Sequence, residues 1–523
     1  MLMKNVGYAH LREHLMLGVL PPRCPARVRP VTRLMRLEEE LSVPPERVPA
    51  DDDLLAHMLF ALKHEGVDLA ILAESLPHLP VDALVAALEA SPNGIYLRRL
   101  ACLYEALVAP LPLEPEVKGR VVPLFDPEHY VTGPANRNSR WRVDVNGLGT
   151  LHYCAAVRRT PEIEALLKED ILAEARAFMA SLPPGMLDRA IQWAYLSEAQ
   201  SSFEIEREVP SPDKQQRFMW LLRKAHDGQS LDEGYLVELQ NSIVSNPFDK
   251  APAFRHEQNY LHNGLPGAIG VSYLPPPPEL CETLMEALME WANGLSEAGG
   301  EATSARVPAL VAATVLSFSF VFLHPFMDGN GRISRFLLHH MLCRLGELPR
   351  GNLLPVSIAM KRHEGEYLAA LEAFSVPARE QWRVNWIDAD HHDFHFEGSD
   401  SLYRYWDATQ AVAFTLKMSR EALREDLKSE TRYLACFDRV YRAIDARFDV
   451  RGSDLSRLVM MCLSHDGVLS KNRRRQFRYR VPEEVLDAIE AEARKALDES
   501  ANQGQTLQPS GRPPHRGQTL RKT

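Results

Sequence analysis

The pattern of hydrophobic and polar positions predicts a chain built mainly from helices. Asp53 precedes leucine and methionine residues that recur every three or four positions through residue 62, which is the spacing of one helical face. An aspartate at this place can accept hydrogen bonds from the first turn and so begin the helix. Residues 186–208 show one long stretch of the same kind, and the helical spacing returns beyond residue 400. We therefore expect a mainly α fold.

Residues 307–323, VPALVAATVLSFSFVFL, are apolar on every side of the expected helix. No Asp, Glu, Lys or Arg occurs from Val307 to Met327. A helix that crosses a membrane needs about 20 predominantly apolar residues, and prolines, serines and a threonine interrupt this run. We interpret it as a helix buried in the core of the protein rather than as a membrane span.

Proline-rich and glycine-rich segments divide the chain into regions. The segment APLPLEPE at 109–116 ends the first helical region, and residues 140–157 alternate around Asn146-Gly147, as in a small β-hairpin. Residues 254–273 are rich in glycine and aromatic residues and predict a loop with a second hairpin. We therefore predict an N-terminal helical region (1–110), a connector with a small hairpin (111–184), a core (185–399), a C-terminal helical region (400–499) and a disordered tail (500–523).

The composition argues against several classes of protein, such as nucleic-acid-binding, membrane-bound and secreted proteins. The chain has 523 residues, which is too long for a single hydrophobic core, and its formal net charge is -10. A mildly acidic chain gives no general electrostatic attraction to nucleic acid or membranes. Seven cysteines are scattered without a C-x-x-C pair, which indicates free thiols in a reducing compartment. Charges interrupt the apolar N-terminus, which makes it a poor signal peptide, and we expect a cytoplasmic protein.

The expected buried helix leads directly into the polar segment HPFMDGNGRISR at 324–335. Pro325 disfavours a helical conformation at His324, so the helix should end there and hold the histidine at a fixed place. Residues 329–331, Gly-Asn-Gly, predict a tight turn whose successive N–H groups can surround an anion. The following residues have helical periodicity, and the N-terminus of that helix directs its dipole and free donors at the same place.

Four side chains near this turn have the chemistry of a nucleotide site. Arg332 and Arg335 lie on one face of the first helical turn, where two guanidinium groups suit a polyphosphate. Asp328 supplies a hard oxygen ligand for a magnesium ion that bridges phosphates. His324 can take a proton from an attacking hydroxyl. Together they predict a nucleotide-dependent transfer to a hydroxyl group.

Each of these residues also has an ordinary interpretation. A single histidine at the end of an apolar helix is more often a core residue, and basic residues at a helix start are commonly solvated. Residues 329–334 also match half of a dinucleotide-binding fingerprint, but Ser334 occupies the place of its third small residue and no acid follows at the expected spacing. We favour the phosphate-binding interpretation because all of the required residues occur together.

The segment resembles the signature of the Fic (filamentation induced by cAMP) family, HxFx(D/E)GNGRxxR. Every position of the signature is present: His324, Phe326, Asp328, Gly329, Asn330, Gly331, Arg332 and Arg335. Residues 254–255 and 273–278 resemble the flap and the following helix start of Fic domains, and residues 357–375 resemble a later core helix. The resemblance covers about residues 185 to 380. It implies a helical core bundle with a β-hairpin flap, flanked by N- and C-terminal helical regions.

Fic proteins usually catalyse adenylylation, so the resemblance implies that ATP reacts with a Tyr, Ser or Thr hydroxyl of a protein. The products are AMP–protein and pyrophosphate. In that reaction His324 is the general base and Asp328 holds Mg²⁺. The remaining signature residues bind phosphates, the α- and β-phosphates by Gly329, Asn330 and Gly331, and the β- and γ-phosphates by Arg332 and Arg335. The target backbone is expected to add to the flap as a strand.

Many Fic proteins carry an inhibitory helix with the pattern (S/T)xxxE(G/N). Ser202 and Glu206 match its hydroxyl and carboxylate positions, four residues apart on one face of the expected helix. Arg207 stands where the family has Gly or Asn. The resemblance implies that Glu206 pairs with Arg335 and holds the transferase off within the same chain. The alternative is an ordinary Ser–Glu pair on the protein surface.

Other functions remain open on the same residues. The same site can remove AMP from a modified protein through an activated water, and other Fic proteins transfer phosphate or phosphocholine. A third interpretation is a non-catalytic protein that binds a partner or DNA through its terminal helical regions, and a homodimer is also open. The basic segment KNRRRQFRYR at 471–480 is relevant to DNA, but a charge run is more often a solvated face. We therefore expect neither nucleic acid nor a membrane as a partner.

Residues 388–398, DADHHDFHFEG, hold His391, His392 and His395. Histidine side chains bind metals, but aromatic residues interrupt this segment and it lacks an ordered ligand spacing. We interpret it as a polar loop, and we expect Mg²⁺ and ATP to be the ligands of the protein.

Overall fold

The computed structural model describes residues 4–114, 116–244, 246–265, 267–297, 306–388 and 391–502. Most of these residues are helical, which confirms the mainly α fold. Their contacts define two compact units, each assembled from several segments of the chain. The first unit contains Met1–Glu169, Trp220–Glu347 and Gly365–Leu416, and the second contains Asp170–Met219, Leu348–Glu364 and Lys417–Thr523. The division into five consecutive regions stays a prediction.

The N-terminal part of the first unit combines helices with a small sheet. Asp53 caps α2, as expected, because its carboxylate accepts a hydrogen bond from the Ala56 N–H at 2.9 Å. The helices are α1 (Gly7–His14), α2 (Leu54–His64), α3 (Leu69–Ser75), α4 (Val81–Ala90) and α5 (Ile95–Leu107). Residues 1–110 are not helical alone, because they also contain β1 (Asn5–Val6), β2 (Ala26–Val28), β3 (Met35–Arg36) and β4 (Leu41–Val43), paired in the order β1-β2-β4-β3. Strands of two or three residues are too short to show an alternating pattern in the sequence.

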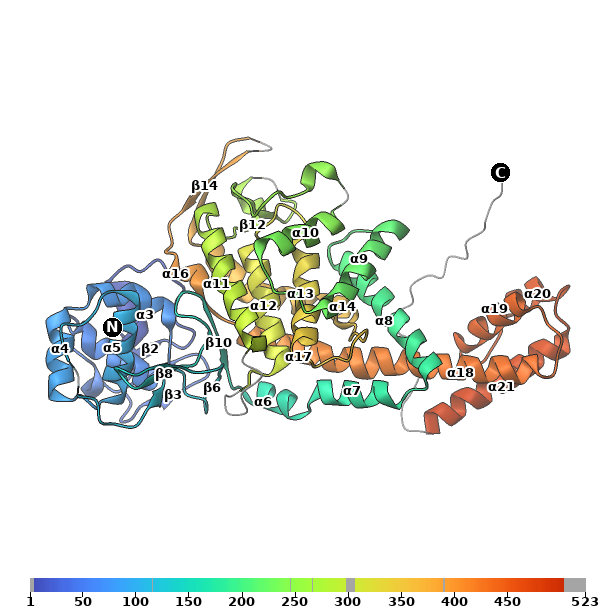
Figure 1. Ribbon diagram of the computed structural model, residues 1–523, viewed down its shortest axis with the longest axis horizontal. Helices are drawn as coiled ribbons and strands as arrows, with labels where there is room; N and C mark the ends of the chain where they lie inside the picture. The colour runs from blue at the N-terminus through green and yellow to red at the C-terminus, as the bar shows by residue number, and fades with distance from the viewer. Residues whose placement is uncertain are drawn as a thin grey trace. The chain divides into compact units, whose positions relative to one another are not determined.

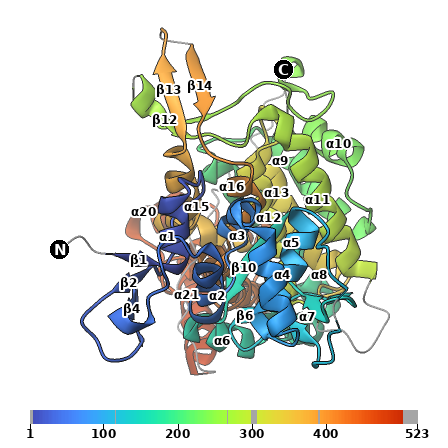
Figure 2. The same cartoon turned by 90° about the vertical axis from the view of Figure 1, so that its left-hand side faces the viewer.

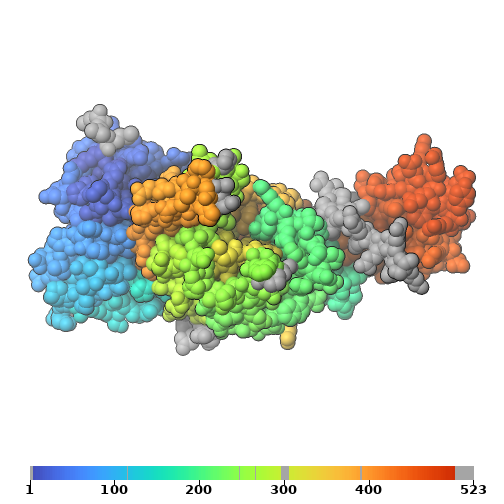
Figure 3. Space-filling model, turned by 90° about the horizontal axis from the view of Figure 1, so that it is seen from above, coloured from blue at the N-terminus to red at the C-terminus, as the bar shows by residue number. Residues whose placement is uncertain are grey.

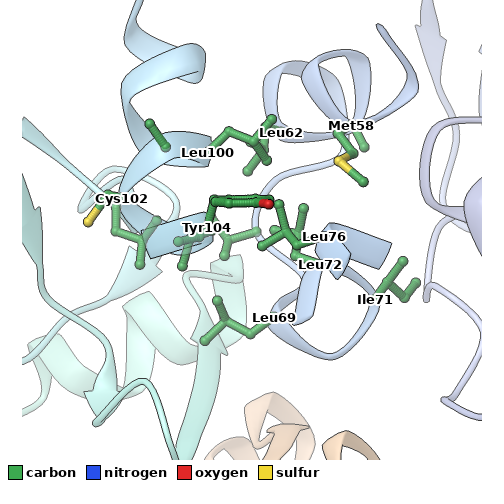
Figure 4. Close-up of a cluster of buried hydrophobic side chains, with 14 of the residues drawn as sticks. Met58, Leu62, Leu69, Ile71, Leu72, Leu76, Leu100, Cys102 and Tyr104 are labelled. Atoms are coloured by element: carbon green, nitrogen blue, oxygen red, sulfur yellow. The ribbon is translucent and has the colours of Figure 1, made fainter. Parts of the chain in front are cut away.

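Side chains from α2, α3 and α5 form the hydrophobic core of this part (Figure 4). Met58 and Leu62 of α2, Leu72 of α3 and Leu100 of α5 are all buried in this cluster. Full burial of one such side chain contributes about 1.5–3 kcal/mol. The helical face recognised in the sequence after Asp53 is therefore the face that packs.

Residues 122–158 form short strands rather than the hairpin expected around Asn146-Gly147. The Asn146 side chain is buried, accepts a hydrogen bond from the Phe125 N–H and donates one to the Phe125 carbonyl oxygen, both at 2.9 Å. It therefore joins two backbone segments instead of closing a turn, and the expected hairpin is wrong. β8 (Val143–Val145) pairs with β5 (Val122–Pro123) and β7 (Asn136–Asn138), whereas β10 (Cys154–Arg158) pairs with β6 (Tyr130–Val131), β9 (Leu148–Gly149) and β15 (Tyr405–Asp407).

Helices around α12 form the bundle of the first unit (Figure 1). They are α10 (Glu233–Ile243), α11 (Pro278–Glu297), α12 (Ala309–Leu323), α13 (Asn330–Arg344), α15 (Glu364–Arg379) and α17 (Thr409–Glu421). α12 packs against α11 and α13, and all of its side chains except Val321 are buried, so the expected buried helix is confirmed. Within the described residues, no single helix is both long and apolar enough to cross a membrane, although Leu69–His78 and Val81–Ala90 would pass together as a pair bent by 105°.

Two β-hairpins belong to the same unit (Figure 2). β11 (Leu261–His262) and β12 (Val271–Tyr273) pair antiparallel and form the expected flap. β13 (Trp382–Trp386) and β14 (His392–Phe396) form a second antiparallel hairpin. This hairpin corrects the polar loop expected at 388–398, because His392, Phe394 and Phe396 alternate with exposed residues and place their rings on one half-buried face.

Helices form the second unit. They include α7 (Ile171–Ser181), α8 (Pro184–Ile205), α14 (Val356–Arg362), the π-helix η7 (Ala422–Leu427), α18 (Lys428–Asp445), α19 (Gly452–Leu463), α20 (Lys471–Phe477) and α21 (Glu483–Asn502). Apolar side chains of α18, α19 and α21 form a separate core. Residues 500–502 continue α21 rather than begin a disordered tail, and the rest of the expected tail lies outside the described residues.

Candidate active site

His324 lies at the C-terminal end of α12, where the sequence predicts that the helix ends. α12 ends at Leu323, and His324 adopts a left-handed conformation with φ 49° and ψ 57°. Its ring nitrogen Nδ1 lies 3.1 Å from the Val321 carbonyl oxygen. Since a carbonyl oxygen only accepts, Nδ1 carries the proton and the lone pair of the neutral ring is on Nε2. The histidine is therefore fixed in the tautomer that a general base acting through Nε2 requires.

Arg255 holds the residues that follow α12 in place. Its guanidinium donates to the His324 carbonyl oxygen at 3.0 Å and to the Pro276 carbonyl oxygen at 2.5 Å, and its backbone N–H donates to the Pro325 carbonyl oxygen at 2.8 Å. Burial lowers the pKa of Arg255 from its usual value, and the carbonyl oxygens stabilise the charge that the side chain still carries. Sequence reasoning places this residue at the flap but misses its role. Its only signal is a lone arginine in a glycine- and aromatic-rich segment.

Two buried asparagines fix residues 324–329, which we call the motif loop. Asn330 Nδ2 donates to the Phe326 carbonyl oxygen at 2.6 Å, and Asn330 Oδ1 accepts from the Phe326 N–H at 3.0 Å. Asn259, from the segment before the flap, donates to the same carbonyl oxygen at 2.9 Å. The Asn330 side chain therefore shapes the loop, which leaves its backbone N–H for the phosphate-binding role that the sequence predicts at this position.

Gly329 begins α13 in a conformation that suits glycine. Its φ is 89°, and a Cβ at this position would lie 3.3 Å from Ile243. The first hydrogen bond of α13 joins the Ile333 N–H to the Gly329 carbonyl oxygen at 3.0 Å. The N–H groups of residues 330–332 precede that bond and form the positive end of the helix dipole. The anion-binding turn expected from the sequence therefore lies at the N-terminus of a helix of 15 residues.

Two buried arginines and one exposed aspartate lie at the start of α13. Arg332 Nη2 lies 3.2 Å from both carboxylate oxygens of Asp328, and Arg335 follows on the next turn. Both arginines are buried, whereas Asp328 is exposed. Two buried guanidinium groups beside a helix N-terminus suit a polyphosphate. Asp328 fits Mg²⁺, which takes one or two carboxylates together with phosphate oxygens and water. The predicted phosphate and metal residues are thus brought together, and their individual roles stay predictions.

The predicted inhibitory residues lie at the C-terminal end of α8 in the second unit. Ser202 is buried in the last turn, and Glu206 is the exposed C-cap residue. Arg207 adopts a left-handed conformation with φ 57°. The Arg207 N–H donates to the Glu204 carbonyl oxygen and the Glu208 N–H to the Phe203 carbonyl oxygen, both at 3.0 Å. This pair of bonds is the Schellman ending of a helix, which usually has glycine or asparagine at the left-handed position.

α8 is anchored within the second unit by buried contacts. Glu198 accepts hydrogen bonds from the Ser357 N–H at 2.8 Å and from the Ser357 hydroxyl at 2.5 Å, at the start of α14. Phe203 packs edge-on against Phe218, with ring centroids 5.7 Å apart. A carboxylate at a helix N-terminus also interacts favourably with the helix dipole. Contacts within the second unit therefore anchor the helix that Glu206 caps.

Among the described residues, one group of three potential metal ligands lies close enough to share an ion: His10, Asp51 and His57, with ligand atoms within 4.8 Å of one another. His57 Nδ1 accepts a hydrogen bond from the Gly7 N–H at 3.1 Å, so Nε2 carries the proton of the neutral ring. A histidine ligand instead donates from the nitrogen that does not bind the metal. The geometry does not fit a metal, and stacking of the His10 and His57 rings, 3.8 Å apart, accounts for the cluster.

Part of the basic segment at 471–480 forms ion pairs within the second unit. Arg474 lies 2.6 Å from Asp487 and 3.1 Å from Glu490, and it also pairs with Glu483. The hydrogen bond to Asp487 is the main cause that raises the pKa of Arg474. Arg474 therefore joins α20 to α21, while Arg475 remains exposed, as expected for a solvated face.

Comparison with known proteins agrees with the geometry at the start of α13. Residues 230–342 match the family described as Fic/DOC family. These residues are similar to a Fic domain. The match includes the flap, the motif loop and most of α13, whereas Ser202 and Glu206 lie outside it.

Named relatives match the chain over part of their length. The protein adenylyltransferase fic-1 of Caenorhabditis elegans is 27% identical over 172 residues, which cover 32% of this chain and 29% of the relative. The protein adenylyltransferase Fic of Drosophila willistoni is 27% identical over 225 residues, which cover 37% of this chain and 42% of the relative. The chain thus spans less than half the length of these relatives.

Two solved structures also match. A Fic family protein from Desulfovibrio desulfuricans is 22% identical with a TM-score of 0.37, and the match covers 61% of this chain and 87% of that one. A Fic domain containing signaling protein from Bacteroides thetaiotaomicron is 20% identical with a TM-score of 0.35, over 51% of this chain and 96% of that one.

Proposed function

We propose that the protein is a protein adenylyltransferase that transfers AMP from ATP to a Tyr, Ser or Thr hydroxyl of a target protein. The observation that carries the proposal is the fixed tautomer of His324 beside two buried arginines at the N-terminus of α13. A base and a polyphosphate site are the two requirements of this reaction. The relatives support the proposal, because both are named protein adenylyltransferases.

Different residues of the Fic domain perform different parts of the proposed reaction. The N–H groups at the start of α13, together with Arg332 and Arg335, bind and orient the phosphates of ATP. The target hydroxyl oxygen attacks the α-phosphorus while His324 Nε2 takes its proton. The bond between the α-phosphorus and the bridging oxygen breaks, and pyrophosphate leaves. Mg²⁺ held by Asp328 would offset part of the phosphate charge.

ATP labelled at different phosphates distinguishes this proposal from its alternatives. With the full chain in Mg²⁺, α-label should reach protein hydroxyls, and γ-label should leave in pyrophosphate. Transfer of γ-label would instead indicate a phosphotransferase. Release of AMP from a protein modified beforehand, without transfer, would indicate the reverse, hydrolytic activity. Failure of both labels to reach protein, even with the Glu206→Gly variant, would indicate a non-catalytic protein.

We further propose that Glu206 restrains the transferase. The support is local: Ser202 lies in the last turn of α8, Glu206 is its C-cap residue, and Arg207 keeps the left-handed conformation that suits the Gly or Asn of the inhibitory pattern. A carboxylate that pairs with a phosphate-binding arginine competes with the γ-phosphate of ATP. Such a contact at about 4 Å is worth about 4 kcal/mol at an effective dielectric near 20, before desolvation is subtracted.

Replacement of Glu206 tests this restraint. Glu206→Gly should raise self-modification by α-labelled ATP about tenfold or more, because the α-phosphate can then align for in-line attack. Glu206→Gln is the matched control for charge, and it should give an intermediate gain. Equal labelling of wild type and Glu206→Gly at saturating ATP and Mg²⁺ would remove the inhibitory role and leave the transferase proposal intact.

A further inference from the structure

The β13–β14 hairpin and the flap share an apolar core. Val271 and Leu274 of the flap segment are buried together with Trp382 of β13. Tyr260, which directly precedes β11, lies against β14, with its ring centroid 5.4 Å from that of His392 and 5.2 Å from that of Phe394. Figure 2 shows β12, β13 and β14 side by side. The two hairpins therefore form one structure.

Hydrogen bonds fix the hairpin on the flap. Arg379, just before β13, donates to the Val271 carbonyl oxygen at 3.0 Å and to the Trp382 carbonyl oxygen at 2.8 Å. Trp382 Nε1 donates to the Tyr403 hydroxyl at 2.8 Å, and that hydroxyl donates to the Leu274 carbonyl oxygen at 2.6 Å. Since the segment before the flap is itself bonded to the motif loop, the hairpin, the flap and the motif loop form a continuous hydrogen-bonded structure.

Large apolar side chains are exposed along this structure. Trp386 and Ile387 have exposed fractions of 58% and 61%, and Leu265, Ile269 and Met327 are also exposed. We call these five residues the apolar rim. Single exposed apolar residues are ordinary on protein surfaces, but several on three connected segments around one reaction site indicate an interaction surface.

Two residues of the apolar rim, Ile269 and Trp386, lie on segments through which the hairpin and the flap are packed together. The turn η5 (Ala268–Gly270), which contains Ile269, contacts β13. Trp386 pairs across the hairpin with His392, whose ring lies beside Tyr260. In Figure 3 the orange surface that includes the hairpin adjoins the yellow-green surface that includes the flap. Ile269 and Trp386 therefore lie on segments of the two hairpins that are packed together.

The hairpin is acidic as well as apolar. Residues 382–397 contain one arginine and four acidic residues, which gives a formal balance of -3 with histidine neutral. Arg383 lies 3.5 Å from Glu397, near the base of the hairpin. Among the described acidic residues, Asp388 directly follows Ile387 and Asp393 lies opposite Asn385 of β13, and both side chains are exposed. A partner that complements this surface carries apolar and basic side chains.

We propose that the hairpin and the flap together dock an extended, apolar and basic segment of the protein substrate. The inference rests on the proposed transferase function, because such a segment brings its hydroxyl to the motif loop. Both hairpins are two-stranded, so an extended segment can pair with an open strand edge and place alternate side chains on the apolar rim. The hairpin thus gives the transferase a preference among targets that strand pairing alone does not provide.

A binding experiment tests the docking without relying on catalysis. The probe is a short fluorescent peptide with a central Tyr, flanked by Val and Lys in alternation, and its binding to the full chain is measured by anisotropy. Replacing Lys by Glu in the peptide should weaken binding about tenfold or more, because the hairpin is acidic. Replacing Val by Ser should weaken it to a similar degree, because the peptide then has no apolar side chains to cover the apolar rim, where large aromatic side chains such as Trp dominate the binding energy. Trp386→Ala should weaken binding of the Val–Lys peptide to the same degree. Trp220 is exposed to 54% and lies outside the two hairpins, so Trp220→Ala is the matched control. This variant should bind the peptide with the affinity of the wild type.

The outcomes separate this inference from the proposed function. Equal binding of the three peptides, or no effect of Trp386→Ala, would overturn the docking surface even if α-label reaches the peptides. Selective binding that depends on Trp386, without transfer of any label, would keep the docking surface and refute the transferase. Sedimentation of wild type as a dimer and of Trp386→Ala as a monomer, without competition by the peptide, would show that a second copy covers the surface and would also overturn the proposal.

Discussion

Several helices of this protein are followed by a non-glycine residue in the left-handed conformation, and two of these residues, His324 and Arg207, bear on the proposed reaction. His324 follows α12 with φ 49°, and Arg207 lies just beyond α8 with φ 57°. The left-handed conformation costs a residue with a Cβ about 1–2 kcal/mol. The surroundings differ, because His324 is held by Arg255 and by the partly buried motif loop, whereas Arg207 is exposed and its backbone is held by the Schellman bonds.

The difference shows where backbone strain is tied to chemistry. At His324 the side chain is the proposed base, so the strained conformation can be kept only if neighbouring groups enforce it. At Arg207 the backbone alone matters for the inhibitory pattern, because the Glu206 carboxylate is the group expected to act. A family pattern that requires Gly or Asn can therefore lose that residue while the helix ending keeps its geometry.

The largest expected effect comes from a variant that removes the proposed base at position 324 but keeps the left-handed backbone conformation. His324→Asn keeps a residue that tolerates the left-handed conformation but removes the base. We expect AMP transfer to fall about 10²–10⁴-fold, with ATP affinity close to that of wild type, because the imidazole acts on the hydroxyl. His324→Ala should lose the same activity and also some stability. Transfer by His324→Asn at the wild-type rate, measured with α-labelled ATP and one target, would refute the assignment of the base.

The second effect tests whether Arg255 holds His324 in its left-handed conformation. Arg255→Ala removes the guanidinium from several buried carbonyl oxygens, and we expect it to lower the free energy of unfolding by about 3 kcal/mol. Arg255→Lys keeps the charge but reaches fewer acceptors, so its loss should be smaller. Urea unfolding measures both. If Arg255→Ala is as stable as wild type, the motif loop does not depend on this side chain, and the comparison between the two helix ends fails.

A smaller effect tests the two asparagines of the motif loop. Asn330→Ala leaves the buried Phe326 N–H without its acceptor, and we expect a loss of about 2 kcal/mol. Asn259→Ala leaves the Phe326 carbonyl oxygen still bonded to Asn330, so the loss should be about 1 kcal/mol. The same urea titration compares them. The reverse order would show that Asn259 is the main support of the loop.

The candidate site could be predicted closely because its residues are consecutive in the sequence. His324, Asp328, Arg332 and Arg335 occupy one turn and one helix start, so local rules for proline, glycine and helix dipoles apply to them. Arg255 is far away in the sequence, and its role depends on tertiary contacts that no local pattern contains.

The elements of the fold were predicted correctly where apolar residues recur at helical spacing over a long segment. α12 and α2 show clear helical patterns, and both were found. The β13–β14 hairpin was missed because the histidines at 392 and 395 suggested a polar loop, although residues 392–396 alternate. The hairpin at Asn146 was predicted and is absent, because the side chain forms tertiary hydrogen bonds that the dipeptide Asn-Gly does not reveal.

The smallest expected effect tests the exposed helix end alone. Arg207→Gly removes the Cβ from a left-handed position, which relieves about 1–2 kcal/mol, but it also adds freedom to the unfolded chain at a cost of about 0.5–1 kcal/mol. We expect a net gain in stability of about 0.5–1 kcal/mol. Lys361 and, more weakly, Arg207 lower the pKa of Glu364, so the arginine side chain has an attraction of its own.

Arg207→Ala is therefore the control, because it loses that attraction but keeps the Cβ in the left-handed conformation. Thermal unfolding should rank Arg207→Gly above wild type, and wild type at or slightly above Arg207→Ala. Self-modification by α-labelled ATP should stay low in both variants, because each retains the Schellman ending and Glu206. If Arg207→Gly is no more stable than Arg207→Ala, the conformation is not strained at this position. In that case the two helix ends would differ in backbone energy as well as in their surroundings.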